Sequence, residues 1–324
     1  MLVLSETDLR QLLPPVECIP VMRSALADLA RGEVHQPVQR PVLIPPSAAG
    51  LIAAMPAYTA TPSAAFGLKA VCVFPGNPAA GLDAHQGAVL LFSGTTGEPL
   101  AILNASTVTE LRTPAVTAVA TDLLARPDAA ELVVVGAGVQ AVAHARALAG
   151  VRPFRRIRLV ARDAARTAAA CARLAPELDV PVEAASSLAD AVATADVVVT
   201  ATTSKTPLLD RSWLRPGTHV NAVGSSIPST REIDTATMAA ATLFADAASS
   251  MAVETGDYLF AAAETAIEIK ASIGDVLAGT ASGRTSADEL TLFKSVGLAV
   301  EDLYAARHAY NLAGSRGIGT RITL

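Results

Sequence analysis

The sequence is poor in cysteine and lacks long apolar runs, and we expect no export signal in its first residues. Its three cysteines, Cys18, Cys72 and Cys171, are scattered without metal-ligand spacing, so we expect reduced thiols, no zinc or other metal site and no catalytic cysteine. No stretch approaches the roughly 18 uninterrupted apolar residues of a membrane-spanning helix. The first ten residues contain Glu6 and Asp8 rather than a charged-then-apolar signal layout. These shortages predict a cytoplasmic protein without a membrane partner.

Aromatic residues and blocks of positive charge are also scarce. Aromatics make up only 4% of the chain, whereas apolar residues, largely Ala and Val, make up 51%. This composition suits Val-rich parallel strands covered by Ala-rich helices. The net charge is −5 with no basic block, which argues against a nucleic-acid partner. A chain of 324 residues is long enough to bury a large core and to form two domains.

A dinucleotide-binding unit is predicted at Glu131–Arg146. The apolar run Leu132–Val135 is typical of a buried strand, and it leads through Gly136 and Gly138 into an Ala-rich helix. The first glycine permits a tight turn and the second lets the backbone approach a pyrophosphate, while Ala141 stands where a third glycine is usual. The helix N-terminus favours phosphate, although many such turns bind nothing. The predicted cofactor contacts at this turn are Gly136, Gly138, Val139 and Gln140.

Strands and helices alternate from Glu131 onward, which predicts a doubly wound parallel sheet. The predicted strands are Leu132–Val135, Ile157–Ala161, Val182–Ala184, Val197–Ala201, Thr218–Val223 and Leu243–Ala245. The predicted helices between the first four strands are Gln140–Ala149, Ala164–Leu174 and Leu188–Ala193.

The N-terminal part has a different pattern, which indicates a separate domain with an antiparallel or mixed sheet. Ser5 is the expected N-cap of a first helix, with Asp8 at its third position. A second helix is predicted at 16–31, and a long helix at Thr285–Ala313 near the C-terminus, followed by a tail that can pair with the N-terminal domain. The expected strands are Val38–Ile44, Leu51–Pro56, Phe66–Phe74, Ala88–Phe92 and Pro99–Leu103.

The segment Leu111–Ala115 suggests an anion site. It lies within a pattern that is helical from Thr107 to Ala125, and there Thr113 can cap a segment whose first helical residue is Pro114, the position that proline favours. Arg112 would then lie beside a helix N-terminus, and both groups attract an anion. An ordinary surface arginine is the alternative interpretation.

Two arginines after the second predicted strand bear on the choice of cofactor. NAD-specific folds usually place Asp or Glu at the end of this strand to hold the ribose 2′-hydroxyl. Here Arg162 stands first and Arg166 follows one helical turn later, an arrangement suited to a 2′-phosphate. NADP(H) is therefore the predicted preference, with NAD(H) possible, because a one-residue shift would make Asp163 the ribose ligand.

Taken together, motifs along nearly the whole chain resemble the ornithine cyclodeaminase/mu-crystallin family. They are Gly67-Leu-Lys-Ala-Val, Phe74-Pro-Gly-Asn-Pro, His85-Gln-Gly, Leu91-Phe, Leu111-Arg-Thr-Pro-Ala, Gly136-Ala-Gly-Val-Gln-Ala, Asn221-Ala-Val-Gly and Leu292-Phe-Lys-Ser-Val-Gly. The resemblance implies a homodimer and a discontinuous α+β substrate and dimerisation domain at 1–118 with 303–324. It also implies a Rossmann domain at 119–302, and hydride transfer between a nicotinamide and the Cα–N bond of an amino or imino acid.

By position, the resemblance makes Arg112 the substrate-carboxylate arginine and Lys69 the active-site lysine, with Arg40 less securely aligned. An arginine can clamp a carboxylate through two N–H bonds. A lysine held near other cations has a lowered pKa suited to protonating an imine; a solvated strand-end lysine is the alternative. The expected pocket wall includes Met55, Tyr58 and His85. Further predicted cofactor contacts are Thr113, Thr202, Val223 and Ser225.

Ser226 stands where the family's cyclodeaminases carry an aspartate that handles the second amino group of ornithine. A neutral hydroxyl cannot replace that carboxylate as a base or as an ammonium ligand. The leading hypothesis is therefore an NAD(P)H-dependent reductase of a cyclic or preformed α-imino acid, with Ser226 near the substrate. The alternatives are ornithine cyclodeamination, alanine-dehydrogenase-like reductive amination and a non-catalytic NADPH-dependent small-molecule binder.

Overall fold

The computed structural model describes residues 1–323, which form two compact units. One unit comprises Met1–Arg112 together with the segment from Leu298 onward, and the other comprises Thr113–Gly297. The predicted boundaries, 118/119 and 302/303, lie a few residues further along the chain. Among the described residues, no helix combines the length and the apolar character that crossing a lipid bilayer requires.

The first unit contains a mixed sheet. Its strands are β1 (Leu2–Leu4), β2 (Val34–His35), β3 (Val42–Leu43), β4 (Leu51–Thr59), β5 (Ala65–Val73), β6 (His85–Ser93), β7 (Pro99–Asn104) and β16 (Thr320–Arg321). Their order is β16-β1-β7-β6-β5-β4-β2, with β3 also paired to β4. All neighbours are antiparallel except β1 and β7. The predicted pairing of the C-terminal tail with this domain is confirmed by β16, which lies against β1.

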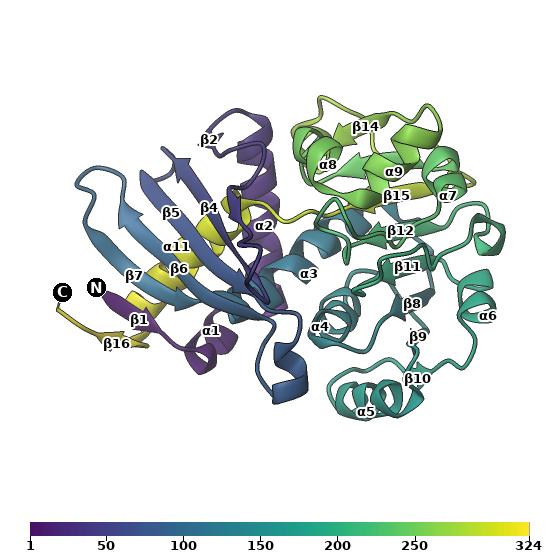
Figure 1. Ribbon diagram of the computed structural model, residues 1–324, viewed down its shortest axis with the longest axis horizontal. Coiled ribbons are helices and arrows are strands. Elements are labelled where there is room, and N and C mark those ends of the chain that lie inside the picture. Colours follow the sequence, from purple (N-terminus) through teal and green to yellow (C-terminus); the bar gives the residue numbers. More distant parts are fainter. Residues whose placement is uncertain (324) are drawn as a thin grey trace. The chain divides into compact units, whose positions relative to one another are not determined.

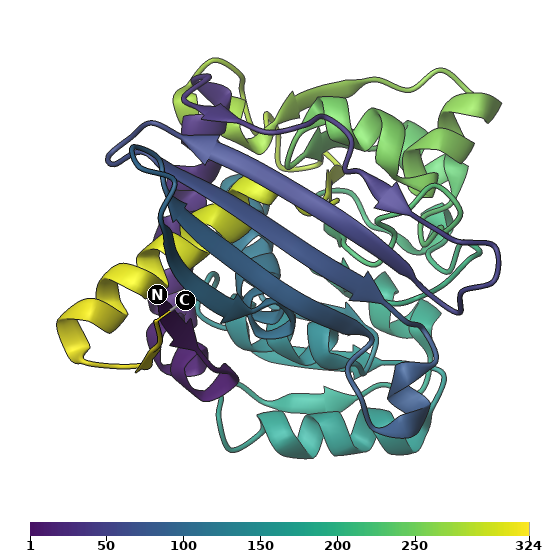
Figure 2. The same ribbon diagram turned by 60° about the vertical axis from the view of Figure 1, so that its left-hand side comes forward.

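Helices cover one face of this sheet. The helices of the unit are α1 (Glu6–Leu12), α2 (Pro15–Ala30), the 3-10 helix η1 (Asn77–Ala80), the start of α3 (Ala105–Leu124) and α11 (Ala299–Arg316). In Figure 1, α11 runs in yellow across the strands β4–β7. Figure 2 shows the opposite face of the same strands in front, with no helix across it. The burial of β4 and β5 alternates accordingly, since successive side chains point to opposite faces.

Local signals in this unit behave as the sequence predicts. Ser5 caps α1 in a capping box in which Asp8, at the third helical position, bonds back to the Ser5 backbone. Helix α2 ends at Ala30, next to the predicted stop, and Gly32 adopts a φ of +75°. A positive φ is a conformation that glycine adopts without steric cost.

The second unit is built on a parallel sheet. Its strands are β8 (Glu131–Val135), β9 (Arg156–Val160), β10 (Val182–Ala184), β11 (Val197–Thr200), β12 (His219–Ala222), β13 (Thr242–Ala245), β14 (Ile269–Ser272) and β15 (Thr291–Lys294). They follow the order β10-β9-β8-β11-β12-β15-β13-β14, and every pair is parallel. Its helices besides α3 are α4 (Val139–Leu148), α5 (Ala164–Leu174), α6 (Leu188–Ala193), η2 (Arg211–Trp213), α7 (Thr235–Ala240), α8 (Ala248–Glu254), α9 (Gly256–Glu264) and α10 (Ile273–Ala278).

The predicted fold class is confirmed: this is a doubly wound parallel sheet of Rossmann type. The order reverses at β8, whose neighbours are β9 on one side and β11 on the other. In open sheets of this kind, ligands bind beyond the carboxyl ends of the strands at such a reversal. The turn that begins at Gly136 lies at that position.

The predicted long helix at Thr285–Ala313 is wrong over its first half. Residues 291–294 form β15 between β12 and β13, and all four are buried. The turn that follows is fixed by the Asp246 carboxylate, which accepts from the backbone N–H groups of Val296 and Gly297, each at 2.8 Å. A segment of four buried residues fits a helix as well as a strand that is buried on both faces, so its apolar pattern cannot distinguish the two. Here the pairing with β12 and β13 makes it a strand.

Candidate active site

Lys69 lies in the middle of β5, on the sheet face that α11 covers. It pairs with Met55 on β4 and with Val89 on β6, and the residue is only 3% exposed. The alternative of a solvated strand-end lysine is therefore wrong. A Cβ at Gly67 would come within 3.0 Å of Leu303, so the missing side chain lets α11 pack close to β5 beside this lysine.

A buried ionic cluster joins β5, α3 and α11. The Lys69 ammonium lies 2.7 Å from Oδ2 of Asp302. On the other side of the same carboxylate, Nε of Arg112 donates to Oδ1 at 3.1 Å, and Nη1 of Arg112 donates to Glu301 at 2.6 Å. All four side chains are at most 4% exposed. The two predicted substrate-binding cations are thus brought together by a shared carboxylate.

The charges of this cluster shift its protonation. Burial lowers the pKa of Lys69 to about 8; Asp302 opposes that shift, while the cations Arg112 and Arg40 reinforce it. Burial acts to raise the pKa of Asp302, but Arg112 and Lys69 outweigh it and the pKa falls. Nearby, burial raises the pKa of the Cys18 thiol to about 12. Near neutral pH the site therefore holds a proton on the lysine amine and none on the carboxylate, and Lys69 is poised to exchange its proton.

The predicted helical pattern at Thr107–Ala125 is confirmed by α3, but the predicted cap at Thr113 is wrong. Helix α3 begins at Ala105, after Asn104, whose side chain accepts the backbone N–H of Thr107 at 2.9 Å. Thr113 is buried in the middle of the helix, and Pro114 is inside it. Arg112 therefore gains nothing from a helix N-terminus. Its environment is set by the carboxylates of α11 instead.

Of the other residues predicted to line the substrate site, three lie near Lys69 or act on its charge, and one lies on the opposite face of the sheet. Met55, at 5% exposure, lies on the Lys69 face of β4, directly opposite Lys69. Burial and the cations Lys69 and Arg112 lower the pKa of His85, at the start of β6. Arg40, half-buried between β2 and β3, acts electrostatically on Lys69. The prediction that Tyr58 lines the pocket is wrong, because Tyr58 points to the opposite sheet face, where its ring is tilted against that of Phe66, with the centroids 4.6 Å apart.

The Gly136 turn of the second unit fits a dinucleotide. Gly136 has a φ of +134°, and a Cβ there would lie 2.7 Å from the carbonyl oxygen of Ala201. Gly138 is the N-cap of α4 without a side-chain cap, and a Cβ there would meet nothing within 4 Å. Val139 is 54% exposed, and Gln140 is half-buried. An uncapped helix N-terminus beside open space is the arrangement that accommodates a pyrophosphate.

Beyond β9, the structure separates the two predicted ribose contacts. Asp163 caps α5 by accepting the backbone N–H of Arg166 at 3.0 Å. The side chains of Arg162 and Arg166 are exposed and make no ion pair among residues 1–323. The carboxylate is thus engaged in helix capping, while both guanidinium groups stand in solvent.

Glu232 ties together the carboxyl ends of β11 and β12. Its Oε1 accepts the backbone N–H and the hydroxyl of Thr202, at 2.7 and 2.8 Å. Its Oε2 accepts the hydroxyl of Thr200 at 2.8 Å and the backbone N–H of Gly224 at 2.7 Å. Thr202, a predicted cofactor contact, therefore has its hydroxyl committed within the protein. Glu232 itself is fully buried.

A second buried ion pair supports this carboxylate. Nζ of Lys294, on β15, lies 2.9 Å from Oδ2 of Asp257, and neither side chain is exposed. Oδ1 of Asp257 accepts the backbone N–H of Glu232 at 2.7 Å. Burial raises the pKa of Glu232, whereas the charge of Lys294 lowers it. Sequence reasoning missed all three residues; the signal that could have found them is Lys294 inside the apolar run of the Leu292 motif.

The loop after β12 contains the remaining predicted contacts. Val223 is half-buried, and its backbone N–H donates to Thr200. The hydroxyl of Ser225 is buried and donates to the carbonyl of Thr230 at 2.5 Å, so only its backbone can serve a ligand. Ser226 is half-buried. No hydrogen bond of its hydroxyl is seen within the described part of the chain.

Glu301 and Asp302 were also missed from the sequence. They lie between Val300 and Leu303, which share one face of the predicted C-terminal helix, so the helical period places both carboxylates off that apolar face. Their burial therefore has no local signal in the sequence, although buried carboxylates are rare unless they are paired. The pattern by itself does not say which cations pair with them.

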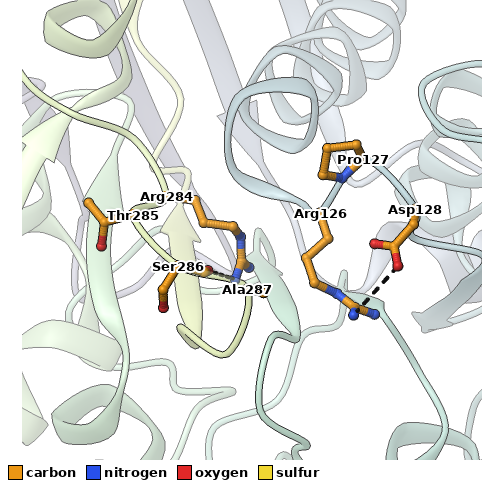
Figure 3. Close-up of a pocket in the computed structure, with 7 residues that line it drawn as sticks. All are labelled: Arg126, Pro127, Asp128, Arg284, Thr285, Ser286 and Ala287. Atoms are coloured by element: carbon orange, nitrogen blue, oxygen red, sulfur yellow. Dashed lines mark hydrogen bonds and ion pairs between the residues drawn. The ribbon is translucent and has the colours of Figure 1, made fainter.

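A shallow pocket of about 380 Å³ in the second unit contains none of the residues predicted to bind substrate or cofactor. Figure 3 shows Arg126, Pro127 and Asp128 on one side and Arg284 with its three following residues on the other. These loops precede β8 and β15, at the strand ends opposite to the Gly136 turn. Arg284 donates to the carbonyls of Leu124 and Ser286, so it serves as a loop clamp. Within residues 1–323, no cluster of His, Cys, Asp and Glu is arranged to hold a metal ion.

These features define the class of protein: a two-unit α/β protein with a dinucleotide-type turn in one unit and a buried Lys–Arg–carboxylate cluster in the other. A profile of the ornithine cyclodeaminase/mu-crystallin family matches residues 1–317. The mouse ketimine reductase mu-crystallin is 36% identical over 296 residues, which cover 90% of this chain and 91% of the relative. The chain belongs to the ornithine cyclodeaminase/mu-crystallin family.

Two solved structures are similar over their full length. The Δ1-pyrroline-2-carboxylate reductase of Thermococcus litoralis, in complex with NADH and L-proline, has a TM-score of 0.96 and 33% identity, covering 99% of this chain and 100% of that one. An archaeal alanine dehydrogenase dimer with bound NAD has a TM-score of 0.92 and 29% identity, covering 100% and 99%.

Proposed function

We propose that the protein is an NAD(P)H-dependent reductase that converts a cyclic or preformed α-imino acid, of the pyrroline- or piperideine-2-carboxylate type, into the amino acid. The observation that carries the proposal is the pair of buried cations held by one carboxylate, Lys69 and Arg112 on Asp302. Relatives that reduce ketimines and pyrroline-2-carboxylate support it.

Each cation has a distinct task in this reaction. An α-carboxylate is best held by a guanidinium, which offers N–H bonds in a fixed plane; Arg112 takes this task and Arg40 adds positive charge. An imine accepts hydride only when its nitrogen is protonated, and Lys69, with a pKa of about 8, can supply that proton near neutral pH. Met55, opposite Lys69, provides an apolar wall. A nicotinamide, when bound, supplies the hydride to the imine carbon.

The second unit supplies the cofactor site in this proposal. Gly136, Gly138, Val139 and Gln140 hold the pyrophosphate at the N-terminus of α4. The loop from Val223 to Ser226 lies beside the nicotinamide, with Ser225 contributing backbone only. Ser226 offers no carboxylate for a second amino group, which favours imine reduction over ornithine cyclodeamination.

The test is a spectrophotometric assay with NADH or NADPH and 1-pyrroline-2-carboxylate or 1-piperideine-2-carboxylate. We expect cofactor oxidation with the wild type and a fall of at least about a hundredfold in kcat for Lys69→Met, the low end for one general acid. Lys270→Met, at an exposed lysine of the second unit, is the matched control and should retain activity. Ammonia release from ornithine with NAD, together with no imine reduction, would refute the proposal.

Reductive amination is a second candidate, because the alanine dehydrogenase dimer matches the chain so closely in fold. This reaction starts from a 2-oxo acid and an amine, so its rate depends on added ammonia. Pyruvate with and without ammonium separates the two candidates in the same assay. Preformed imine should be consumed at a rate independent of ammonium if the first proposal holds.

For the cofactor, we propose a preference for NADP(H). The exposed guanidinium groups of Arg162 and Arg166 support this preference, as does the use of Asp163 as a helix cap. The two related structures, by contrast, hold NADH and NAD. A lower KM for NADPH than for NADH is expected, and Arg162→Ala should raise the KM for NADPH alone. Arg173→Ala, later on α5, is the control. Equal KM values for both cofactors would contradict the preference.

For the assembly, we propose a homodimer formed through the uncovered face of the first unit's sheet. Its apolar side chains Ile52 and Phe66 are 42% and 48% exposed, and Leu43 on β3 is 63% exposed. Exposed apolar side chains on a sheet face without a covering helix are typical of an interaction site, and a related structure is a dimer. Light scattering should give twice the chain mass for the wild type, and Phe66→Glu should reduce it. A monomeric wild type would overturn the proposal.

A further inference from the structure

Asp302 lies in the first turn of α11, enclosed by cations from two other elements. One carboxylate oxygen is 2.7 Å from the Lys69 ammonium on β5. The other accepts Nε of Arg112 on α3 at 3.1 Å. With 1% of its surface exposed, Asp302 has almost no access to solvent. The residue therefore connects the two groups that act on a substrate, without being one of them.

Two features make this bridge necessary. Lysine carries its charge on a flexible four-carbon stem, so its ammonium has no fixed position unless a partner holds it. Two cations also repel each other strongly when water is excluded. The charges of Lys69 and Arg112 are balanced here by those of Glu301 and Asp302, and Asp302 contacts both cations.

We infer that Asp302 is a positioning residue for the proposed reduction: it fixes the Lys69 ammonium relative to the Arg112 guanidinium, and so fixes the proton donor relative to the carboxylate of the substrate. The inference rests on the proposed function, since it concerns the geometry of that same site. Glu301 has the narrower task of holding the second nitrogen of the guanidinium.

The electrostatics of Lys69 separate this role from a purely structural one. The groups that act on Lys69 are Asp302, which raises its pKa, and Arg112 and Arg40, which lower it; His85 faces the same cations. Asp302→Asn removes the carboxylate charge that raises the pKa of Lys69. Because the reaction needs the protonated lysine, the alkaline fall in kcat/KM must then begin at a lower pH.

The experiment compares the wild type with Asp302→Asn, Asp302→Glu and Glu301→Gln. The kcat and KM for 1-pyrroline-2-carboxylate are measured across the pH range. Independently, the titration of Lys69 is followed without substrate by NMR of ¹³C-labelled lysine. The chain has only four lysines, and Lys69→Met assigns the signal.

For Asp302→Asn we expect the lysine titration and the alkaline limb to move together by about one pH unit or more, with kcat lowered at least about tenfold. Asp302→Glu should keep the titration near that of the wild type but lower kcat, because the carboxylate is displaced. Glu301→Gln should leave the titration in place and act mainly on KM.

An unchanged titration and a kcat within about twofold of the wild type in Asp302→Asn would overturn the inference. If Asp302→Asn does not fold, full activity in Asp302→Glu overturns it and a lowered kcat with an unmoved titration supports it. A wild type without imine reduction refutes the proposed function instead. The lysine titration still decides in that case whether Asp302 controls Lys69.

Discussion

Replacement of Glu232 by Gln should destabilise the second unit and weaken cofactor binding together. The carboxylate accepts four hydrogen bonds, two of them from the backbone N–H groups of Thr202 and Gly224. A glutamine keeps the shape but has one oxygen, so its NH2 group faces a donor on the other side. One buried N–H is left without an acceptor, at a cost of about 1–3 kcal/mol.

The lost charge does not add to this cost, because burial raises the pKa of Glu232 and so disfavours the ionised carboxylate. The substitution leaves the buried ion pair of Lys294 and Asp257 in place. We therefore take about 1–3 kcal/mol as the total. For a unit of this size the corresponding fall in Tm is on the order of 5 °C. The shifted backbone at Thr202 and Gly224 should raise the Kd for NAD(P)H by about tenfold, which corresponds to 1.4 kcal/mol.

Urea unfolding and fluorescence titration with NAD(P)H measure the two effects. The matched control is Glu177→Gln, because Glu177 is 37% exposed and pairs with Arg146 at the surface; the loss of this charge should cost less than about 1 kcal/mol. A Glu232→Gln protein that stays within about 1 kcal/mol of the wild type, with an unchanged cofactor Kd, would refute the reasoning that the carboxylate holds these strand ends.

Further predictions concern the turn, acid stability and a helix cap. Gly136→Ala should unfold the turn region, because of its φ of +134° and a 2.7 Å approach to a carbonyl oxygen, whereas Gly138→Ala should fold normally and weaken only cofactor binding; thermal melts and NAD(P)H titration distinguish them. Burial lowers the pKa of His219 to about 3, so its stabilising effect is complete above its unfolded pKa near 6.5 and is lost as pH falls toward 3; a Tm profile that is flat over this range in the wild type would contradict this. Ser5→Ala should cost about 1 kcal/mol in urea unfolding, and Ser24→Ala should cost less.

The second unit follows closely from local sequence, since strongly periodic segments carry their own information. Predicted helices at 164–174 and 188–193 agree with α5 and α6, and the strand at 182–184 agrees with β10. Each αβ repeat combines an apolar run, a glycine or a cap, and an amphipathic helix. The prediction failed for a segment outside these αβ repeats: residues 291–294 pair as a central strand although their apolar period is helical.

In the candidate site, too, the residues with local sequence motifs could be predicted, and those held by distant partners could not. Lys69, Arg112 and Gly136 could be singled out from the sequence because their motifs are local. Glu232 could not, since its partners lie on strands some thirty residues earlier and on a loop eight residues before it.

What the sequence by itself determined was the class of each unit, the dinucleotide-type turn and the identity of the two candidate substrate cations. Only the tertiary structure decided how those cations are held. Asp302 reaches Lys69 and Arg112 because α11, from the far end of the chain, packs onto the face of β5 where Lys69 points. A carboxylate about 190 residues away in sequence has no local signal for its partner, because charge pairing depends on distance in space alone.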